Sequence, residues 1–359
     1  MMFGGVYRGR KVLVTGHTGF KGSWLVLWLR AIGAEPIGLA LAPDTAPSHW
    51  DMLGLDMPSH LVDVRDREAV REVVAASGAE IVFHLAAQPL VRRSYREPIE
   101  TWDANVMGTV HVLDACRACA DVRAIVSITT DKCYENNEWV WGYRENDRLG
   151  GHDPYSASKA AAELVAASYR KSYFAASGQL LATARAGNVI GGGDWSEDRL
   201  IPDLVRAMSG GAPMEIRSPN ATRPWQHVLE CLAGYLMLGQ RLLAGDAAVA
   251  EGWNFGPDKE GNRPVCQVLE EMRVNWPAIV WGQSSAPLPH EANLLYLDSS
   301  KARGLLGWCP VLTFSEAVAM TAAWYRDYIE RGTVSSQAQL LEYCARAAEL
   351  GLFWAVNES

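Results

Sequence analysis

The sequence contains no apolar run long enough to cross a membrane and no excess of basic residues. A membrane-spanning helix needs about 18–20 consecutive apolar residues, and none of the 359 residues belongs to such a run. The formal net charge is −8, whereas a nucleic-acid-binding protein needs a basic face to meet phosphates. The first five residues also lack the apolar core of a signal peptide. We therefore expect a cytoplasmic protein with neither a membrane nor a nucleic acid as partner.

Cysteine is also scarce, and its pattern argues against a disulfide framework. Seven cysteines are scattered along the chain, and an odd number suits reduced thiols. Cys231 and Cys266 lie in apolar stretches. Cys116 and Cys119 form a C-x-x-C pair, but it falls in a helical pattern and has no second pair to complete a metal site. We expect ordinary buried cysteines and no metal.

The first half of the chain alternates strand and helix patterns, which is typical of parallel β-α-β units. Buried strands are expected at residues 11–15, 37–41, 81–85, 124–129 and 180–186, and a further short strand, the third in chain order, is expected to end at residues 61–63. Helices are expected at residues 24–33, 66–77, 99–120 and 155–176. This order predicts an α/β protein with a Rossmann-like, doubly wound parallel sheet, whose ligands bind at the carboxyl ends of the strands.

The pattern changes after Asn188, where a glycine-rich loop is followed by short helices and proline-rich turns. We expect residues 1–188 to form a dinucleotide-binding domain and residues 189–359 to form mainly a smaller, substrate-binding lobe. The chain is expected to return to the first domain near residues 222–256, through a strand at 253–255. The binding site should lie in the cleft between the two parts.

A glycine-rich turn joins the first expected strand to the helix that follows it. Residues 15–22 read Thr-Gly-His-Thr-Gly-Phe-Lys-Gly. Its three glycines allow a tight turn, close approach of the backbone to a pyrophosphate and close packing of the helix, whose N-terminus attracts phosphate. The turn therefore predicts a dinucleotide cofactor. The second strand is followed by neither the usual acidic residue nor an arginine for a 2′-phosphate, and the lack of that arginine favours NAD over NADP.

Tyr155 and Lys159 stand four residues apart, on one face of an expected helix. A phenol with a pKa of about 10 is a poor base at neutral pH, but a nearby ammonium stabilises the phenolate. The pair can then take or return the proton of an alcohol as hydride leaves or arrives. Thr129 and Thr130 place a hydroxyl at the end of the fifth strand to complete the set.

These motifs resemble those of the extended short-chain dehydrogenase/reductase superfamily, in which the glycines are spaced G-x-x-G-x-x-G. The resemblance implies an NAD site formed by the glycine loop, the ends of the third and fourth strands and the catalytic helix. The implied cofactor contacts are Gly16, His17, Thr18, Gly19, Phe20, Gly22, Asp63, Val64, Leu85, Ala86, Ala87, Asn105, Thr129, Tyr155 and Lys159. His17 is bulky for a position in this loop, so an alternative is that its side chain points to solvent.

Asp131 and Lys132 follow Thr130 directly, so that an acid and a base stand at the mouth of the expected sheet. This order resembles that of the nucleotide-sugar 4,6-dehydratases, most of which carry Thr-Asp-Glu here. The lysine, together with the loops at residues 138–145 and 191–195, is similar to the members that act on CDP-glucose. The resemblance implies a lyase that makes a deoxysugar precursor.

In such a lyase, NAD oxidises C4 of the sugar, water is eliminated across C5 and C6, and hydride returns to C6. Thr130, Tyr155 and Lys159 would then serve the oxidation. Asp131 would protonate the departing hydroxyl, and Lys132 would act as the base at C5 or hold a water molecule.

An anionic substrate requires local cations in an acidic protein. The candidates are Arg199 and Arg223, of which Arg223 is the stronger because it adjoins Pro224 in a loop and a planar guanidinium suits phosphate. Asn188 and Gln88 are the polar candidates for substrate contact, and Arg206 is expected on the surface of a helix.

Three alternatives stay open at this point. The chain could be a dehydratase for another nucleotide sugar, a UDP-sugar 4-epimerase or a non-catalytic dinucleotide sensor. The sensor is disfavoured because the Tyr155–Lys159 pair is kept. The superfamily also implies a homodimer that pairs the helix at 99–120 with the helix bearing Tyr155.

Overall fold

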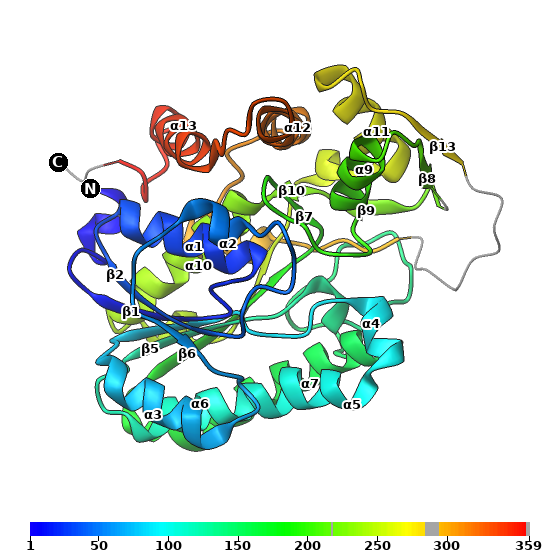
Figure 1. Cartoon of the computed structure of the whole chain (residues 1–359). Coiled ribbons are helices and arrows are strands. Elements are labelled where there is room, and N and C mark those ends of the chain that lie inside the picture. The colour runs from blue at the N-terminus through cyan, green and yellow to red at the C-terminus, as the bar shows by residue number, and fades with distance from the viewer. Residues whose placement is uncertain (217, 284–293, 357–359) are drawn as a thin grey trace.

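Seven parallel strands form the central sheet of the protein, seen edge-on in Figure 1. The computed structural model describes residues 1–216, 218–283 and 294–356. The strands, in sheet order, are β11 (Gly252–Phe255), β6 (Leu180–Ala186), β5 (Ala124–Ile128), β4 (Ile81–His84), β1 (Lys11–Thr15), β2 (Glu35–Ala40) and β3 (Ser59–Leu61). The strand order reverses between β1 and β4, so the sheet is Rossmann-like and doubly wound, as the sequence predicts.

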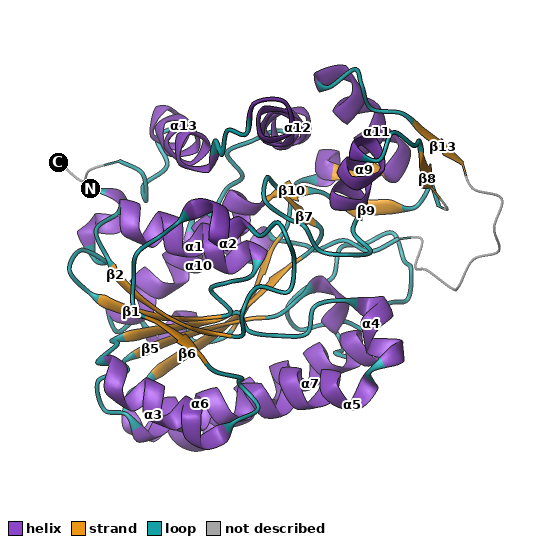
Figure 2. Ribbon diagram, viewed as in Figure 1, coloured by secondary structure: helices purple, strands orange, loops and turns teal. Residues whose placement is uncertain are grey.

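Helices cover both faces of this sheet (Figure 2). One face carries α3 (Arg67–Ser77), α5 (Pro98–Trp102), α6 (Gly108–Ala118) and α7 (Pro154–Tyr169). The other carries α1 (Phe20–Ala31) and α10 (Val228–Leu243), with α12 (Phe314–Arg331) and α13 (Ser336–Glu349) in a further layer. Because the sheet is covered on both faces, the central residues of β1 and the first three residues of β4 are apolar and buried.

A second group of short elements forms a lobe beside the sheet. It contains α9 (Leu200–Ser209), α11 (Val265–Asn275) and three two-stranded sheets. The strands pair as β7 (Val189–Ile190) with β10 (Gln226–His227), β9 (Thr222–Pro224) with β12 (Asn262–Pro264), and β8 (Met214–Ile216) with β13 (Trp281–Gln283). No helix of the described residues has both the length and the apolar character needed to cross a bilayer.

Residues 253–255 lie in β11, which pairs in parallel with β6 at the edge of the first sheet. Residues 222–227, in contrast, belong to the small sheets, and the return begins with α10. The domain division at residue 188 remains a prediction.

Several predicted boundaries shift. The second strand begins at Glu35, and the third ends at Leu61 instead of Asp63. The helix predicted at 99–120 passes through a π-turn, Asp103–Met107, and the helix predicted at 155–176 continues through a second, Arg170–Phe174, into α8 (Ala175–Ser177). Two short helices, α2 (His49–Leu53) and α4 (Val91–Arg96), were not predicted, because five or six residues are too few to show a helical period.

Candidate active site

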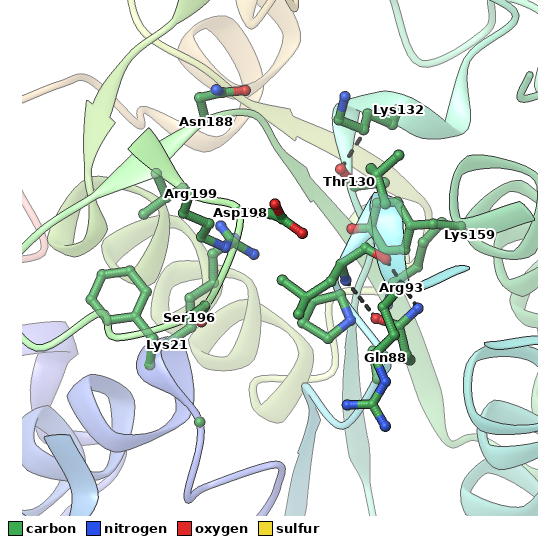
Figure 3. Close-up of a pocket in the computed structure, with 18 of the residues that line it drawn as sticks. Lys21, Gln88, Arg93, Thr130, Lys132, Lys159, Asn188, Ser196, Asp198 and Arg199 are labelled. Atoms are coloured by element: carbon green, nitrogen blue, oxygen red, sulfur yellow. Dashed lines mark hydrogen bonds between the residues drawn. The ribbon is translucent and has the colours of Figure 1, made fainter. Parts of the chain in front are cut away.

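A large cleft of about 1880 Å³ opens at the carboxyl ends of the strands, between the sheet and the lobe. A pocket for one drug-sized ligand usually takes about 300–1,000 Å³, so this cleft has room for two ligands. Figure 3 shows Arg199, Asp198 and Ser196 on one side of the cleft, and Thr130, Lys132 and Lys159 on the other. The site predicted from the sequence therefore lies where a doubly wound sheet binds its ligands.

The glycine loop forms one end of the cleft, and its backbone is packed too closely for larger residues. Gly16 has a φ of +73°, and a Cβ atom there would lie 2.7 Å from the backbone nitrogen of Ala86. A Cβ atom on Gly22 would lie 2.1 Å from the carbonyl oxygen of Gly16. The N-terminus of α1 thus meets the cleft with bare backbone, which suits a pyrophosphate.

Thirteen of the fifteen predicted cofactor residues line the cleft: Gly16, Thr18, Gly19, Phe20, Gly22, Asp63, Val64, Leu85, Ala86, Ala87, Thr129, Tyr155 and Lys159. His17 and Asn105 are missing from the described cleft wall. Their contacts with a cofactor stay predictions.

The His17 side chain does not point to solvent, which corrects that alternative. It is fully buried, with Nε2 2.7 Å from Ser59 Oγ and the ring edge-on to Trp50. The ring occupies the space beside Gly38, where a Cβ atom would lie 2.5 Å from it. Burial lowers the pKa of His17 to about 4. The ring therefore fills a gap against β2 that the sequence pattern did not reveal.

Asn105 lies behind the cleft wall that follows β4 and is hydrogen-bonded to Gln88, which belongs to that wall. The Asn105 side chain accepts from Gln88 N at 2.8 Å and donates to Ser158 Oγ at 2.8 Å. The Gln88 amide donates to Thr101 Oγ1 at 2.9 Å and accepts from Leu90 N at 2.6 Å. Gln88 lines the cleft, but the hydrogen bonds of its side chain are internal.

The reactive pair stands on the first turns of α7. Asp153 caps this helix by accepting from Ser156 N, and Pro154 begins it. Burial raises the pKa of Tyr155 to about 12, and a hydrogen bond with Thr130 opposes this rise. Burial also lowers the pKa of Lys159 to about 8, while its Nζ donates to the Ile128 carbonyl at 3.2 Å. Both shifts favour the neutral forms in the protein without ligands.

Asp131 is buried at the end of β5, with 2 % of its surface exposed. Its Oδ1 accepts from Thr130 Oγ1 at 3.0 Å, and its Oδ2 has no hydrogen-bond partner among the described residues. Burial raises the pKa of this carboxyl, against the charges of Lys132, Arg223 and Lys21. The Lys132 side chain is half-buried in the cleft wall. A carboxyl of raised pKa can give up a proton to a leaving group.

A buried ion pair supports the end of β5, and sequence reasoning missed it. Glu163 lies one turn beyond Lys159 on α7 and is bound by Arg185 from β6, with Nη2 at 2.7 Å from Oε2. The same carboxylate accepts from Thr129 Oγ1 at 2.5 Å and Thr183 Oγ1 at 2.7 Å. The i, i+4 spacing from Lys159 is the signal that could have found it.

Three cations face the cleft from the side of the lobe and α1. Arg199 Nε lies 3.9 Å from Asp194 Oδ2 and has no hydrogen-bond partner among the described residues. Arg223 is buried and donates to the Thr222 carbonyl at 2.9 Å. Lys21, which the sequence analysis did not single out, also lines the cleft, and burial lowers its pKa. Asn188 lines the cleft as well, so an anionic ligand would meet several donors.

Two other predictions are tested by the side-chain contacts. Arg206 is exposed on α9, as expected, and it also donates to the carbonyls of Trp195 and Ser196 at 2.8 and 2.9 Å, so that it holds the loop before α9. All seven cysteines are free, but not all are buried: Cys119 and Cys266 are only partly buried and Cys309 is exposed. The described residues contain no cluster of side chains that could hold a metal.

A doubly wound sheet with a glycine loop and a Tyr-x-x-x-Lys helix is the arrangement of the short-chain dehydrogenase/reductase superfamily. Within it, the chain belongs to the GDP-mannose 4,6-dehydratase family, whose model matches residues 13–321. It is 47% identical, over 94% of its length and 97% of the relative, to a CDP-glucose 4,6-dehydratase of Salmonella typhimurium. It is 27% identical to a dTDP-glucose 4,6-dehydratase of Streptomyces griseus, over 88% of this chain and 94% of that one.

Solved structures agree with this assignment. DesIV, a dTDP-glucose 4,6-dehydratase of Streptomyces venezuelae with NAD and TYD bound, superimposes with a TM-score of 0.74 at 25% identity, over 88% of this chain and 97% of that one. A UDP-glucose 4-epimerase of Thermus thermophilus in complex with NAD has the same fold, with a TM-score of 0.75 at 24% identity over 88% and 99%.

Proposed function

We propose that the protein is an NAD-dependent CDP-glucose 4,6-dehydratase, a lyase that forms CDP-4-keto-6-deoxyglucose and water. The observation that carries this proposal is the buried Asp131 carboxyl, followed by Lys132, beside the Tyr155–Lys159 pair. An oxidoreductase or 4-epimerase needs the pair alone, whereas elimination needs an additional acid and base. The 47% identity to a CDP-glucose 4,6-dehydratase supports CDP-glucose as the substrate.

The residues of the cleft fit NAD and the nucleotide sugar. The bare backbone at Gly16 and Gly22 suits the pyrophosphate of NAD. Asn188, at the end of the first part, and the lobe residues Arg199 and Arg223 suit the diphosphate of the sugar nucleotide. We accordingly propose that residues 1–188 hold mainly the cofactor and residues 189–359 mainly the substrate.

NAD held by the glycine loop would supply the acceptor for the hydride of C4 and the donor of the hydride to C6. Tyr155 takes the proton of the C4 hydroxyl, with Thr130 and Lys159 stabilising its phenolate. The C4 ketone makes the C5 proton acidic, and Lys132 removes it or holds the water that does so. Asp131 protonates the departing C6 hydroxyl, which leaves as water. A proton then returns to C5 as hydride reaches C6.

The decisive experiment is an isotope-transfer measurement. Purified protein with CDP-[4-²H]glucose should yield a 4-keto-6-deoxy sugar that carries the deuterium at C6, read by NMR and mass spectrometry. A product epimeric at C4 would show a 4-epimerase instead, and loss of the label to added NAD would show an ordinary dehydrogenase. The UDP-, dTDP- and GDP-sugars tested in parallel distinguish the nucleotide.

We also propose that the protein works as a homodimer in the cytoplasm. Apolar side chains stand exposed on neighbouring turns of α5, its π-turn and α7, including Ile99 at 77 % and Leu164 at 61 % exposure. Soluble monomers seldom expose such patches.

Leu164→Glu should give a monomer in sedimentation velocity. Val274→Glu, the control on an exposed position of α11, should keep the dimer. A wild-type monomer would contradict the proposal.

A further inference from the structure

His49 is one of the residues that line the cleft. It begins α2, directly after the segment that follows β2 and lines the cleft from residue 41 to 45. Its ring is buried with 2 % of its surface exposed, and it stacks on Trp24 of α1 with ring centres 5.1 Å apart. The proposed mechanism uses no atom of this residue.

The hydrogen bonds of the His49 ring run in one direction. Ser23 Oγ donates to the Phe20 carbonyl at 2.9 Å, so its single proton is committed and Nδ1 of His49, 2.7 Å away, must donate to it. Nε2 then accepts from Ser336 Oγ at 2.7 Å, and that oxygen accepts from Trp324 Nε1 at 2.8 Å. Burial lowers the pKa of His49 to about 3, so the ring is neutral and keeps this tautomer at working pH.

The glycine-rich loop of the lobe rests on the same side chains. The Gly192 carbonyl accepts from Trp24 Nε1 at 2.9 Å. A Cβ atom on Gly192 would lie 1.9 Å from Trp324, and one on Gly193, where φ is +83°, would lie 2.4 Å from His49. Glycine is therefore required at both positions, because the loop backbone lies directly against the two rings.

This loop continues into the residues that face the substrate. Tyr325, next to Trp324 on α12, donates to the Asp194 carbonyl at 2.5 Å, and Asp194 is the ion-pair partner of Arg199. The ring of His49 thus connects the start of α1, at Phe20, with the loop that carries Arg199. Both Phe20 and Arg199 line the cleft.

We propose that His49 is a positioning residue that couples the cofactor site to the substrate diphosphate site. It fixes the glycine loop and the 191–199 loop to each other through Ser23, Ser336 and Trp324, so that ordering one loop with a ligand favours the bound position of the other. This proposal rests on the proposed function, which supplies the two ligands.

The test measures coupling between the two ligands. NAD affinity is determined by calorimetry without and with saturating CDP, and CDP affinity without and with NAD. In the wild type, CDP should tighten NAD binding by about fivefold or more, a usual size for coupled sites, and NAD should tighten CDP by the same factor. In His49→Ala this factor should fall below the wild-type value, because the ring that bonds to Ser23 and packs against Gly193 is lost while the Trp24–Gly192 hydrogen bond still joins the two loops.

Two further variants keep the test decisive if His49→Ala fails to fold. Ser336→Ala removes the hydroxyl that joins His49 to Trp324, and should lower the coupling factor as well. Tyr343→Phe is the matched control: it removes another buried hydroxyl of the C-terminal helices, 2.9 Å from Glu230 and outside the cleft wall, and should leave the factor unchanged.

Equal coupling factors in the wild type and the folded variants, or a factor of one in the wild type, would overturn the role of His49. Failure of the proposed function looks different, since the wild type would then neither turn over CDP-glucose nor bind CDP.

Discussion

The pKa values of Tyr155 and Lys159 are displaced in opposite directions by the same cause, burial. The phenol is harder to ionise than free tyrosine, and the ammonium loses its proton more easily than free lysine. Further positive charge in the cleft would therefore favour the phenolate. The positive nicotinamide ring of the proposed cofactor would supply that charge, so that the base becomes active when the hydride acceptor is in place.

In the proposed mechanism, the oxidation depends on the phenol oxygen of Tyr155. Tyr155→Phe should lower kcat by about 10²–10⁴-fold, the usual contribution of a positioned acid–base group. The affinities for NAD and CDP should stay at wild-type values, because the aromatic ring remains. Steady-state kinetics and calorimetry on the same preparation check both parts.

Tyr7→Phe is the control for this substitution. Its buried hydroxyl donates to the Leu236 carbonyl at 2.6 Å, away from the cleft, so it reports the effect of losing a buried phenol oxygen alone. Full turnover by Tyr155→Phe would show that another group takes the C4 proton.

Sequence spacing located the residues whose role depends on local geometry. Tyr155 and Lys159 share a helix face, and Thr130, Asp131 and Lys132 follow a strand directly, so their position needed only the element type. The packing of the His17 and Asn105 side chains was not predicted, because their partners come from distant segments of the chain. These partners are Ser59 and Trp50 for His17, and Gln88 and Ser158 for Asn105. Spacing along the chain carries no record of such partners.

Among the elements, the glycine loop at residues 16–22 leaves little room for change. Gly22→Ala would place a methyl group 2.1 Å from the Gly16 carbonyl oxygen, and backbone on both sides prevents a side chain from moving aside. We expect a loss of about 1–3 kcal/mol of stability from overpacking and a large loss of NAD affinity. Thermal unfolding and NAD titration measure the two effects.

Gly304→Ala is the matched control, since a Cβ atom there meets no described atom within 4 Å. It should change the melting temperature only slightly and leave the NAD affinity at its wild-type value. Wild-type NAD affinity in Gly22→Ala would show that the pyrophosphate lies elsewhere.

The long elements were predictable and the short ones were not. Continuous apolar runs marked β1, β4, β5 and β6, and a helical period marked α3. The π-turns after α5 and α7 add a residue to one helical turn without altering the amino-acid composition, so no sequence pattern predicts them. Helix α2, which carries His49, is only five residues long and owes its place to contacts with α1 and α13.

For the molecule as a whole, a buried carboxylate joins the C-terminal helices to the sheet layer. Glu230 on α10 accepts from Val311 N at 3.0 Å, Leu312 N at 2.8 Å and Tyr343 OH at 2.9 Å. Burial raises its pKa to about 7, from 4.5 in a free chain. The folded protein therefore holds this proton to higher pH than the unfolded chain does.

Stability should consequently fall as the pH rises through this range. The contribution of Glu230 is complete below pH 4.5 and is lost as the pH rises to about 7. Relative to Glu230→Gln, the wild type should lose up to about 3 kcal/mol between these pH values. Urea unfolding of both proteins at pH 4.5, 6 and 8 measures the difference between their free energies of unfolding. The other titrating groups contribute equally to both proteins and cancel in this difference. Parallel curves would contradict the raised pKa.

The position of β11 has a consequence for how the protein is made. This strand closes one side of the cofactor-binding sheet, yet it is synthesised only after residue 252. Until then the edge of β6 is unpaired, and an exposed apolar edge is prone to associate with other chains. A nascent or truncated chain that ends near residue 188 should therefore depend on chaperones. The two halves of the cleft become able to bind their ligands at the same time, late in translation.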